Sequence, residues 1–267
     1  MSGLHRIAII PARGGSKRIP GKNIRIFCGR PIISYSICAA RDSGLFDSVV
    51  VSTDDRQVAD VARQHGARVP FLRPKELAGD KVPVSRAIAH ALTWLRDQGE
   101  TYDYFCFIMA TAPFVTAGDI RRGWEVMKER NADAAFAVTR YDYPIWRALR
   151  LNNEGRLEMV WQEYRDARSQ DLPEVWHDAG QFYWAKTDVF LDAGDLMGGI
   201  AVPIVVPRYR AQDIDTEEDW SHAELLFRLS NLAGGGQQAG REDVGARETG
   251  GTDKREGTFN NGSRKSR

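Results

Sequence analysis

Short apolar runs alternate with amphipathic runs from residue 5 to residue 138, and this alternation constrains the fold more than any other feature of the sequence. The apolar runs are typical of strands that are buried on both faces. The amphipathic runs repeat apolar residues every three or four positions, as helices do. The pattern predicts an α/β fold, in which helices cover both faces of a doubly wound, mostly parallel sheet. Ligands of such sheets bind beyond the carboxyl ends of the strands.

Each predicted element corresponds to one such run. We expect strands at 5–10, 47–53, 67–72, 104–109, 134–138, 180–186 and 201–207, and helices at 31–44, 55–66, 84–99 and 117–130. A last helix is expected to begin near Thr216, with Trp220, Ala223 and Phe227 facing inward.

The alternation breaks twice. Residues 140–177 are rich in aromatic residues and Arg and contain a predicted hairpin around Asn-Glu-Gly, so we interpret them as an insertion outside the main sheet. We expect this insertion to form a dimer interface, and a surface that stacks on a nucleotide base is the alternative for its aromatic residues. Residues 233–267 are Gly-rich and charged, and they cannot bury enough apolar surface to offset the entropy lost on ordering. We expect them to form a disordered tail. The main α/β domain is then formed by 1–139 and 178–232.

Composition excludes several classes of protein. A net charge of +1 over 267 residues gives no reason to expect a nucleic-acid partner. No apolar run approaches the roughly 20 residues of a membrane span. Cys28, Cys38 and Cys106 are far apart and lack metal-ligand spacing. They are typical of reduced thiols in a cytoplasmic protein.

The stretch IIPARGGSKRIPGKN at 9–23 follows the first predicted strand and combines adjacent glycines with four cationic residues. It does not match the dinucleotide motif G-x-G-x-x-G, because its glycines are adjacent. It does not match G-x-x-x-x-G-K-[ST] either, because five residues separate Gly15 from Gly21 and Asn23 replaces Ser or Thr. Close backbone approach and nearby cations favour phosphate binding by a loop of another type. A solvated basic loop is the alternative.

Two carboxylates, Asp213 and Asp215, follow the predicted strand at 201–207. In an extended segment, residues two positions apart point to the same side. Such a pair beside a phosphate loop suits Mg²⁺, which proteins often bind jointly with phosphate oxygens. The alternative is that these residues cap the last helix, although Thr216 and Glu217 could serve that role instead.

Four motifs occur in a recognisable order: PARGGSKRIPGKN at 11–23, STDD at 52–55, RPKELAGD at 73–80 and QDIDT at 212–216. Over about residues 5–230 the sequence resembles the cytidylyltransferases that activate nonulosonic (sialic-type) sugar acids. The resemblance implies a cytoplasmic, Mg²⁺-dependent homodimer with a nucleotidyltransferase domain. Its substrates would be CTP and a nine-carbon sugar acid. CMP would be transferred from CTP to the anomeric hydroxyl group of the sugar acid, with release of pyrophosphate.

The chemistry and the resemblance together assign roles near the nucleotide. Lys17, Lys22 and Asp215 are expected to be catalytic, and Asp213 and Asp215 to hold Mg²⁺. The expected nucleotide contacts are Arg13, Gly14, Gly15, Ser16, Lys17, Lys22, Asn23, Arg73 and Ser85, with backbone N–H groups of 14–16 assisting. A surface ion pair is the alternative for Arg73. Asp54 and Asp55 are interpreted as caps of the next helix.

Within this family, ATAPF at 110–114 and RSQDLP…HDAGQFYW at 168–184 resemble the pseudaminic acid branch. Met109 stands where sialic acid enzymes carry a Gln that touches the sugar. The expected sugar contacts are Met109, Arg168, Asp178, Gln181, Phe182 and Tyr183, with Arg168 reaching the site of the partner subunit. Neuraminic or legionaminic acid is the alternative substrate, and a KDO-type sugar acid is the third. A non-catalytic regulator that binds nucleotide sugars is the alternative from another class of protein.

Overall fold

The computed structural model describes residues 3–196 and 199–238. Internal contacts divide the chain into Met1–Ser230 and Asn231–Arg267, and the fold below is that of the first unit. Part of the predicted tail, 239–267, lies outside the described residues. The prediction was wrong for 233–238, because α6 (Glu217–Gln238) includes them.

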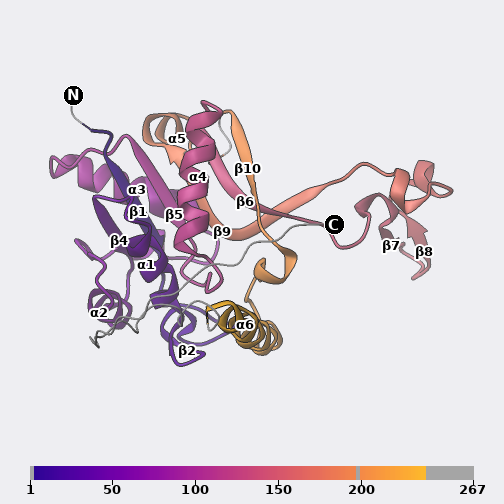
Figure 1. Cartoon of the computed structure of the whole chain (residues 1–267), viewed down its shortest axis with the longest axis horizontal. Coiled ribbons are helices and arrows are strands. Elements are labelled where there is room, and N and C mark those ends of the chain that lie inside the picture. Colours follow the sequence, from indigo (N-terminus) through magenta and orange to yellow (C-terminus); the bar gives the residue numbers. More distant parts are fainter. Residues whose placement is uncertain (1–2, 197–198, 239–267) are drawn as a thin grey trace, which may run out of the picture. The chain divides into compact units, whose positions relative to one another are not determined.

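Within the described residues, a six-stranded sheet has the order β10-β6-β9-β5-β1-β4 (Figure 1). Its strands are β1 (Arg6–Pro11), β4 (Ser48–Ser52), β5 (Tyr104–Ile108), β6 (Ala134–Arg140), β9 (Trp176–Lys186) and β10 (Ala201–Val205). β9 runs antiparallel to both of its neighbours, β5 and β6, and the other neighbouring pairs are parallel. The prediction of an α/β fold with a mostly parallel sheet is therefore confirmed.

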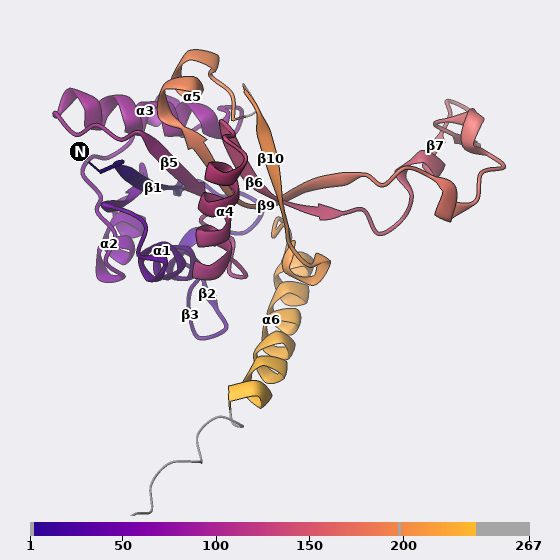
Figure 2. The ribbon, with the colours of Figure 1, turned by 45° about the horizontal axis from the view of Figure 1, so that its top comes forward.

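Helices cover both faces of this sheet. α1 (Ile32–Ser43), α2 (Arg56–Gln64) and α4 (Ala117–Glu129) pack on one face, and α3 (Val84–Asp97) and α5 (Thr187–Ala193) pack on the other (Figure 2). Alternating residues of β1 supply the two cores: Ala8 and Ile10 belong to the first, and Ile7 and Ile9 belong to the second. None of the helices in the described part of the chain is long and apolar enough to cross a membrane.

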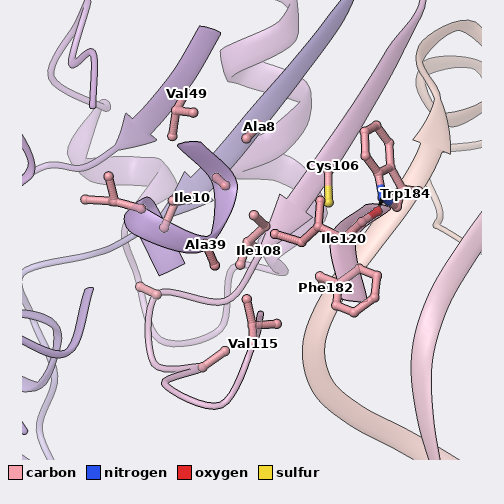
Figure 3. Close-up of a cluster of buried hydrophobic side chains, with 14 of the residues drawn as sticks. Ala8, Ile10, Ala39, Val49, Cys106, Ile108, Val115, Ile120, Phe182 and Trp184 are labelled. Atoms are coloured by element: carbon pink, nitrogen blue, oxygen red, sulfur yellow. Dashed lines mark hydrogen bonds between the residues drawn. The ribbon is translucent and has the colours of Figure 1, made fainter. Parts of the chain in front are cut away.

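The core on the α4 side brings β5, β9 and α4 close together. Figure 3 shows Phe182 and Trp184 of β9 beside Ile108 and Ile120. The indole Nε1 of Trp184 donates a hydrogen bond to the backbone carbonyl of Ile120 at 3.0 Å. A Cβ atom at Gly123 would lie 2.8 Å from each of the two β9 rings, so α4 can approach the strand this closely only with glycine there.

The structure differs from the prediction at 67–72, which contributes only two isolated bridges, Val50 with Arg68 and Thr53 with Leu72. Pro70 lies between these bridges and has no backbone N–H to donate to a neighbouring strand, so a continuous strand is disfavoured. The predicted cap at Asp55 is confirmed, because its carboxylate accepts from the backbone N–H groups of Gln57 and Val58 at 2.7 and 3.1 Å.

The chain between β6 and β9 leaves the sheet. β6 and β9 remain paired out to Arg140 and Trp176, and the residues between them contain the hairpin β7 (Leu149–Leu151) and β8 (Leu157–Met159). In Figures 1 and 2 this hairpin lies beyond the end of the β6–β9 pair, apart from the sheet. The hairpin predicted around Asn-Glu-Gly is therefore confirmed.

A separate apolar cluster, which we call the loop cluster, fixes the basic loop and the loop before α6. It contains Ile19 from the basic loop, Ile214, Trp220 of α6 and Phe27 of β2 (Ile26–Phe27), which pairs with β3 (Arg30–Pro31). All four side chains are buried. Ile214 separates Asp213 from Asp215 in the sequence, so its burial directs the two flanking side chains away from the cluster.

Candidate functional site

A cavity of about 540 Å³ brings residues of three of the four motifs together, and the STDD motif is not among the described residues that line it. Eight of the residues predicted to bind ligand line it: Arg13, Ser16, Lys17, Lys22, Asn23, Arg73, Met109 and Asp215. They come from the loop after β1, the segment between α2 and α3, the end of β5 and the loop before α6. The apolar side of the cavity, which the sequence analysis did not identify, is formed by Leu77, Ala78, Val82, Pro83, Val84 and Ala87.

Side-chain contacts fix the glycine part of the basic loop. The Asn23 side chain donates to the carbonyl of Arg13 at 2.8 Å, and the N–H of Gly14 donates to Asp54 at 3.1 Å. A Cβ atom at Gly14 would lie 2.6 Å from the Asp55 side chain, so glycine permits this close packing. The Gly14 N–H was predicted to assist phosphate binding; here it donates to Asp54, and its contact with phosphate stays a prediction. Asp54 therefore orders the loop and is not a helix cap.

Asp80 is a further residue of the cavity to which the sequence analysis gave no role. Its carboxylate forms ion pairs with Arg13 at 2.6 Å and with Lys17 at 2.7 Å. Hydrogen bonds from Lys17 and Arg13 lower the pKa of Asp80. An anion at this point of the cavity is therefore already stabilised by two cations, which is the property that a phosphate site needs. Its position in the RPKELAGD motif was the signal that could have identified it.

Asp215 of the carboxylate pair contacts the cationic residues, and Asp213 is not among the described residues that line the cavity. Asp215 forms ion pairs with Arg18 at 2.9 Å and Lys22 at 3.1 Å, and Lys22 also donates to the carbonyl of Ile214 at 2.6 Å. Partial burial and the charge of Asp215 raise the pKa of Asp213. The pair of carboxylates would therefore be stabilised by a further cation. Among the described residues, no three His, Cys, Asp or Glu side chains converge as a complete metal site.

Arg73 is buried at the back of the cavity. Its guanidinium lies 3.6 Å from Asp54, and its Nε has no hydrogen-bond partner among the described residues. Burial lowers the pKa of Arg73, and the nearby Asp54 opposes that effect. The alternative of a surface ion pair was therefore wrong, because the side chain is 4% exposed. Ser85 lies in the first turn of α3 and is not among the described residues that line the cavity.

The residues predicted to contact the sugar do not all lie in the cavity, and those of β9 differ in where their side chains lie. Met109 lines the cavity, and Tyr183 donates a hydrogen bond from its hydroxyl to Asp178 at 2.5 Å. Burial, followed by this hydrogen bond, raises the pKa of Tyr183. The predictions for Phe182 and Gln181 were wrong. Phe182 is fully buried in the core of Figure 3, and the buried Gln181 donates from its amide to the carbonyl of Arg210 at 2.6 Å.

Arg168 lies in the insertion and is exposed. It pairs with Asp171 three residues later at 2.6 Å, and it is not among the described residues that line the cavity. Its predicted contact with the sugar bound to a second subunit stays a prediction.

Comparison with known proteins agrees with this arrangement. A family model described as cytidylyltransferase matches residues 7–180. The chain is 38% identical over 228 residues to the pseudaminic acid cytidylyltransferase of Campylobacter jejuni, covering 85% of this chain and 98% of that protein. It is 30% identical over 230 residues to the CMP-N,N'-diacetyllegionaminic acid synthase of Legionella pneumophila, covering 85% and 98%.

Solved structures show the same fold. A CMP:2-keto-3-deoxy-manno-octonic acid synthetase complexed with CTP matches with a TM-score of 0.61 at 16% identity, covering 85% of this chain and 99% of that chain. A 4-diphosphocytidyl-2C-methyl-D-erythritol synthase from Anaerococcus prevotii matches with a TM-score of 0.58 at 12% identity, covering 84% and 99%. With the family model and the two relatives, these findings establish that the chain belongs to the cytidylyltransferase family.

Proposed function

We propose that this chain transfers CMP from CTP to the anomeric hydroxyl group of pseudaminic acid and releases pyrophosphate. The observation that carries the proposal is the cavity in which the basic loop faces Asp215. The hydroxyl oxygen of the sugar would form a bond to the α-phosphorus while the bond to the pyrophosphate oxygen breaks. Such a reaction asks the protein for alignment and for neutralisation of charge more than for covalent chemistry.

The cations of the cavity suit the triphosphate. Arg13 and Lys17 hold the carboxylate of Asp80, and phosphate oxygens would replace it as their partner. Ser16, Lys22 and the largely buried Arg73 line the same cavity. Asn23 would act by fixing the loop through the carbonyl of Arg13.

Asp213 and Asp215 are the residues that would hold Mg²⁺. Their fit rests on the raised pKa of Asp213 and on the donor set, because Mg²⁺ takes one or two carboxylates together with phosphate oxygens. When bound, the ion would neutralise negative charge on the phosphates. Lys22 holds Asp215 in place through its ion pair and through the Ile214 carbonyl.

The choice of sugar rests on Met109 and on the relatives. Met109 offers an adaptable apolar surface. The amide of a Gln at the same position would suit a more polar sugar. Pseudaminic acid carries a methyl group at C9 and a second acylamino group at C7, so it is less polar there than neuraminic acid. Asp178 and Tyr183 stay proposed polar contacts. Neuraminic and legionaminic acids stay the alternative substrates, and the second is named in the Legionella relative.

We expect pseudaminic acid to exceed legionaminic and neuraminic acids by at least about tenfold in kcat/KM, the scale of one or two pocket contacts. The measurement is pyrophosphate release with CTP, Mg²⁺ and each acid in turn. Met109→Gln is the matched variant, and it should reduce the ratio of kcat/KM for pseudaminic acid to kcat/KM for the other two acids. If neuraminic acid equalled or exceeded pseudaminic acid, the proposed substrate would be wrong. Absence of turnover with every acid would instead favour a non-catalytic protein that binds nucleotide sugars.

We further propose that residues 140–177 form a dimerisation insertion between the parts of a nucleotidyltransferase domain at 1–139 and 178–232. The segment exposes Tyr143, Leu149, Leu151 and Leu157, which are 58 to 84% accessible. Exposed apolar and aromatic residues on one segment are typical of protein interfaces. The reaction is proposed to occur in the cytoplasm.

Hybrid dimers test whether the insertion completes the partner site. Arg168→Ala and Lys17→Ala chains should each be impaired alone. Mixing them should restore activity, because one of the two sites in a hybrid dimer then contains both wild-type residues. The measurement is turnover after the two variants are denatured and refolded together, compared with each variant refolded alone. A monomer by light scattering at the working concentration, or no gain on mixing, would contradict the proposal.

A further inference from the structure

The guanidinium of Arg210 joins two chain segments at a buried point. It donates to the carbonyl of Phe114 from Nη2 at 2.8 Å and from Nε at 3.3 Å, and it pairs with both carboxylate oxygens of Asp119. The two side chains of this ion pair are only 17% and 16% exposed. A buried charge pair is maintained when hydrogen bonds satisfy both groups, and removal of one partner leaves the other uncompensated.

Asp119, which forms the ion pair with Arg210, is also held in place. Asp119 forms a capping box with Thr116 at the start of α4, accepting from the Thr116 backbone N–H at 3.0 Å. Phe114 is buried in the loop cluster. The side chain of Arg210 is therefore attached to a rigid part of the fold, at the point where the chain leaves β5 and enters α4.

The backbone of Arg210 is attached to the sheet. Its carbonyl accepts from the Gln181 side chain at 2.6 Å, and the Gln181 carbonyl accepts from the N–H of Met109, a cavity residue, at 2.9 Å. This gives the buried polar Gln181 of β9 a structural explanation, since it links Arg210 to the end of β5. Arg210 thus has contacts to β9 through its backbone and to α4 through its side chain.

Arg210 stands three residues before Asp213 and five before Asp215. The intervening stretch has no regular secondary structure. Its position is set by Arg210 on one side, by Ile214 in the loop cluster, and by Thr216 at the start of α6, whose hydroxyl donates to Asp219 at 2.8 Å. Two carboxylates two positions apart carry like charges, so fixed anchors keep them together before a cation binds.

We propose that Arg210 is a positioning residue that holds the Asp213–Asp215 loop in the geometry that binds the divalent cation. The inference rests on the proposed function, because it assumes that this pair holds the metal. It adds that metal affinity depends on a guanidinium that is not expected to touch metal, nucleotide or sugar. Loss of Arg210 should thus weaken metal binding more than nucleotide binding.

The test measures metal binding directly. Binding of Mn²⁺ is followed by electron paramagnetic resonance in the presence of α,β-methylene CTP, and binding of the same analogue is measured separately in EDTA. Arg210→Met should raise the Kd for Mn²⁺ by about 10- to 100-fold, the effect of losing an outer-shell support. Its affinity for the analogue in EDTA should stay within about twofold of wild type. Arg210→Lys keeps the charge but loses the planar donor geometry, so its Kd for Mn²⁺ should lie between those of wild type and Arg210→Met.

Arg208→Met is the matched control. Arg208 belongs to the same 3-10 turn (Arg208–Arg210) but is exposed and pairs with Asp142 outside the cavity, so its Kd for Mn²⁺ should be unchanged. If Arg210→Met does not fold, the Mn²⁺ affinity of Arg210→Lys is the test. An unchanged Mn²⁺ affinity in a folded Arg210 variant would overturn the proposal. Equal losses of metal and analogue binding would overturn it too. If wild type itself bound no Mn²⁺ in the presence of the analogue, the metal site of the proposed function would be wrong as well.

Discussion

Replacing Asp215 with Asn is expected to lower kcat by more than about 100-fold, the scale of losing one preorganised electrostatic group. The Asp215 carboxylate pairs with Arg18 and Lys22 at 2.9 and 3.1 Å and stands beside Asp213. Asn keeps the size of the side chain but removes the charge that holds both cations and would bind Mg²⁺. The measurement is pyrophosphate release at saturating CTP, sugar acid and Mg²⁺.

Glu217→Gln is the matched control for this variant. Glu217 stands two residues later and also pairs with an arginine, Arg25 at 2.6 Å, but it is 60% exposed and does not line the cavity among the described residues. Exposed ion pairs contribute little to stability, so this change should leave turnover within about twofold of wild type. Near-normal turnover of Asp215→Asn would remove the metal assignment.

Lys22→Met should have an effect of similar size, about 100-fold or more in kcat. Lys22 is 18% exposed and bridges the basic loop to the carboxylate loop through Asp215 and the Ile214 carbonyl. Met preserves the length of the side chain and its apolar stem but removes the ammonium group. A cation would be lost near the phosphates, and Asp215 would lose its more buried partner.

Arg18→Gln is the control that separates loss of the Lys22 bridge from a general loss of positive charge on the basic loop. Arg18 pairs with the same carboxylate, but its side chain is 67% exposed, so its charge is screened by solvent. We expect turnover within about threefold of wild type for Arg18→Gln. A loss as large as that of Lys22→Met would show that the net charge of the loop matters and that the Lys22 bridge does not.

The sequence predicted the features that depend on local patterns. The apolar runs located the central strands, and the repeat of apolar residues every three or four positions located α1 and α3. The four motifs predicted which residues would meet, because loops at the carboxyl ends of neighbouring strands lie side by side. Seven predicted residues from three of these motifs line one cavity in the structure, so the resemblance to the cytidylyltransferases extends from the sequence to the spatial arrangement.

The sequence could not predict which face of a strand a side chain occupies where the strand is apolar on both faces. β9 is such a strand, so Phe182 and Gln181 were assigned to the sugar although they pack in the core and support Arg210. The contacts of Asp80 and Arg210 were also hidden, because their partners Arg13 and Asp119 stand 67 and 91 residues away. Pairings over such distances depend on tertiary structure and leave no local pattern.

The loop cluster has a consequence for how the protein opens. Because Ile19 and Ile214 are buried against Trp220, fraying of the first turns of α6 would release the basic loop and the carboxylate loop together. Both loops should therefore behave as one cooperative opening unit, distinct from the sheet. In native-state hydrogen exchange, the amides around these loops should share one opening free energy, smaller than that of β1 and β5. Catalytic competence would then be lost by a subglobal opening while the α/β core remains folded.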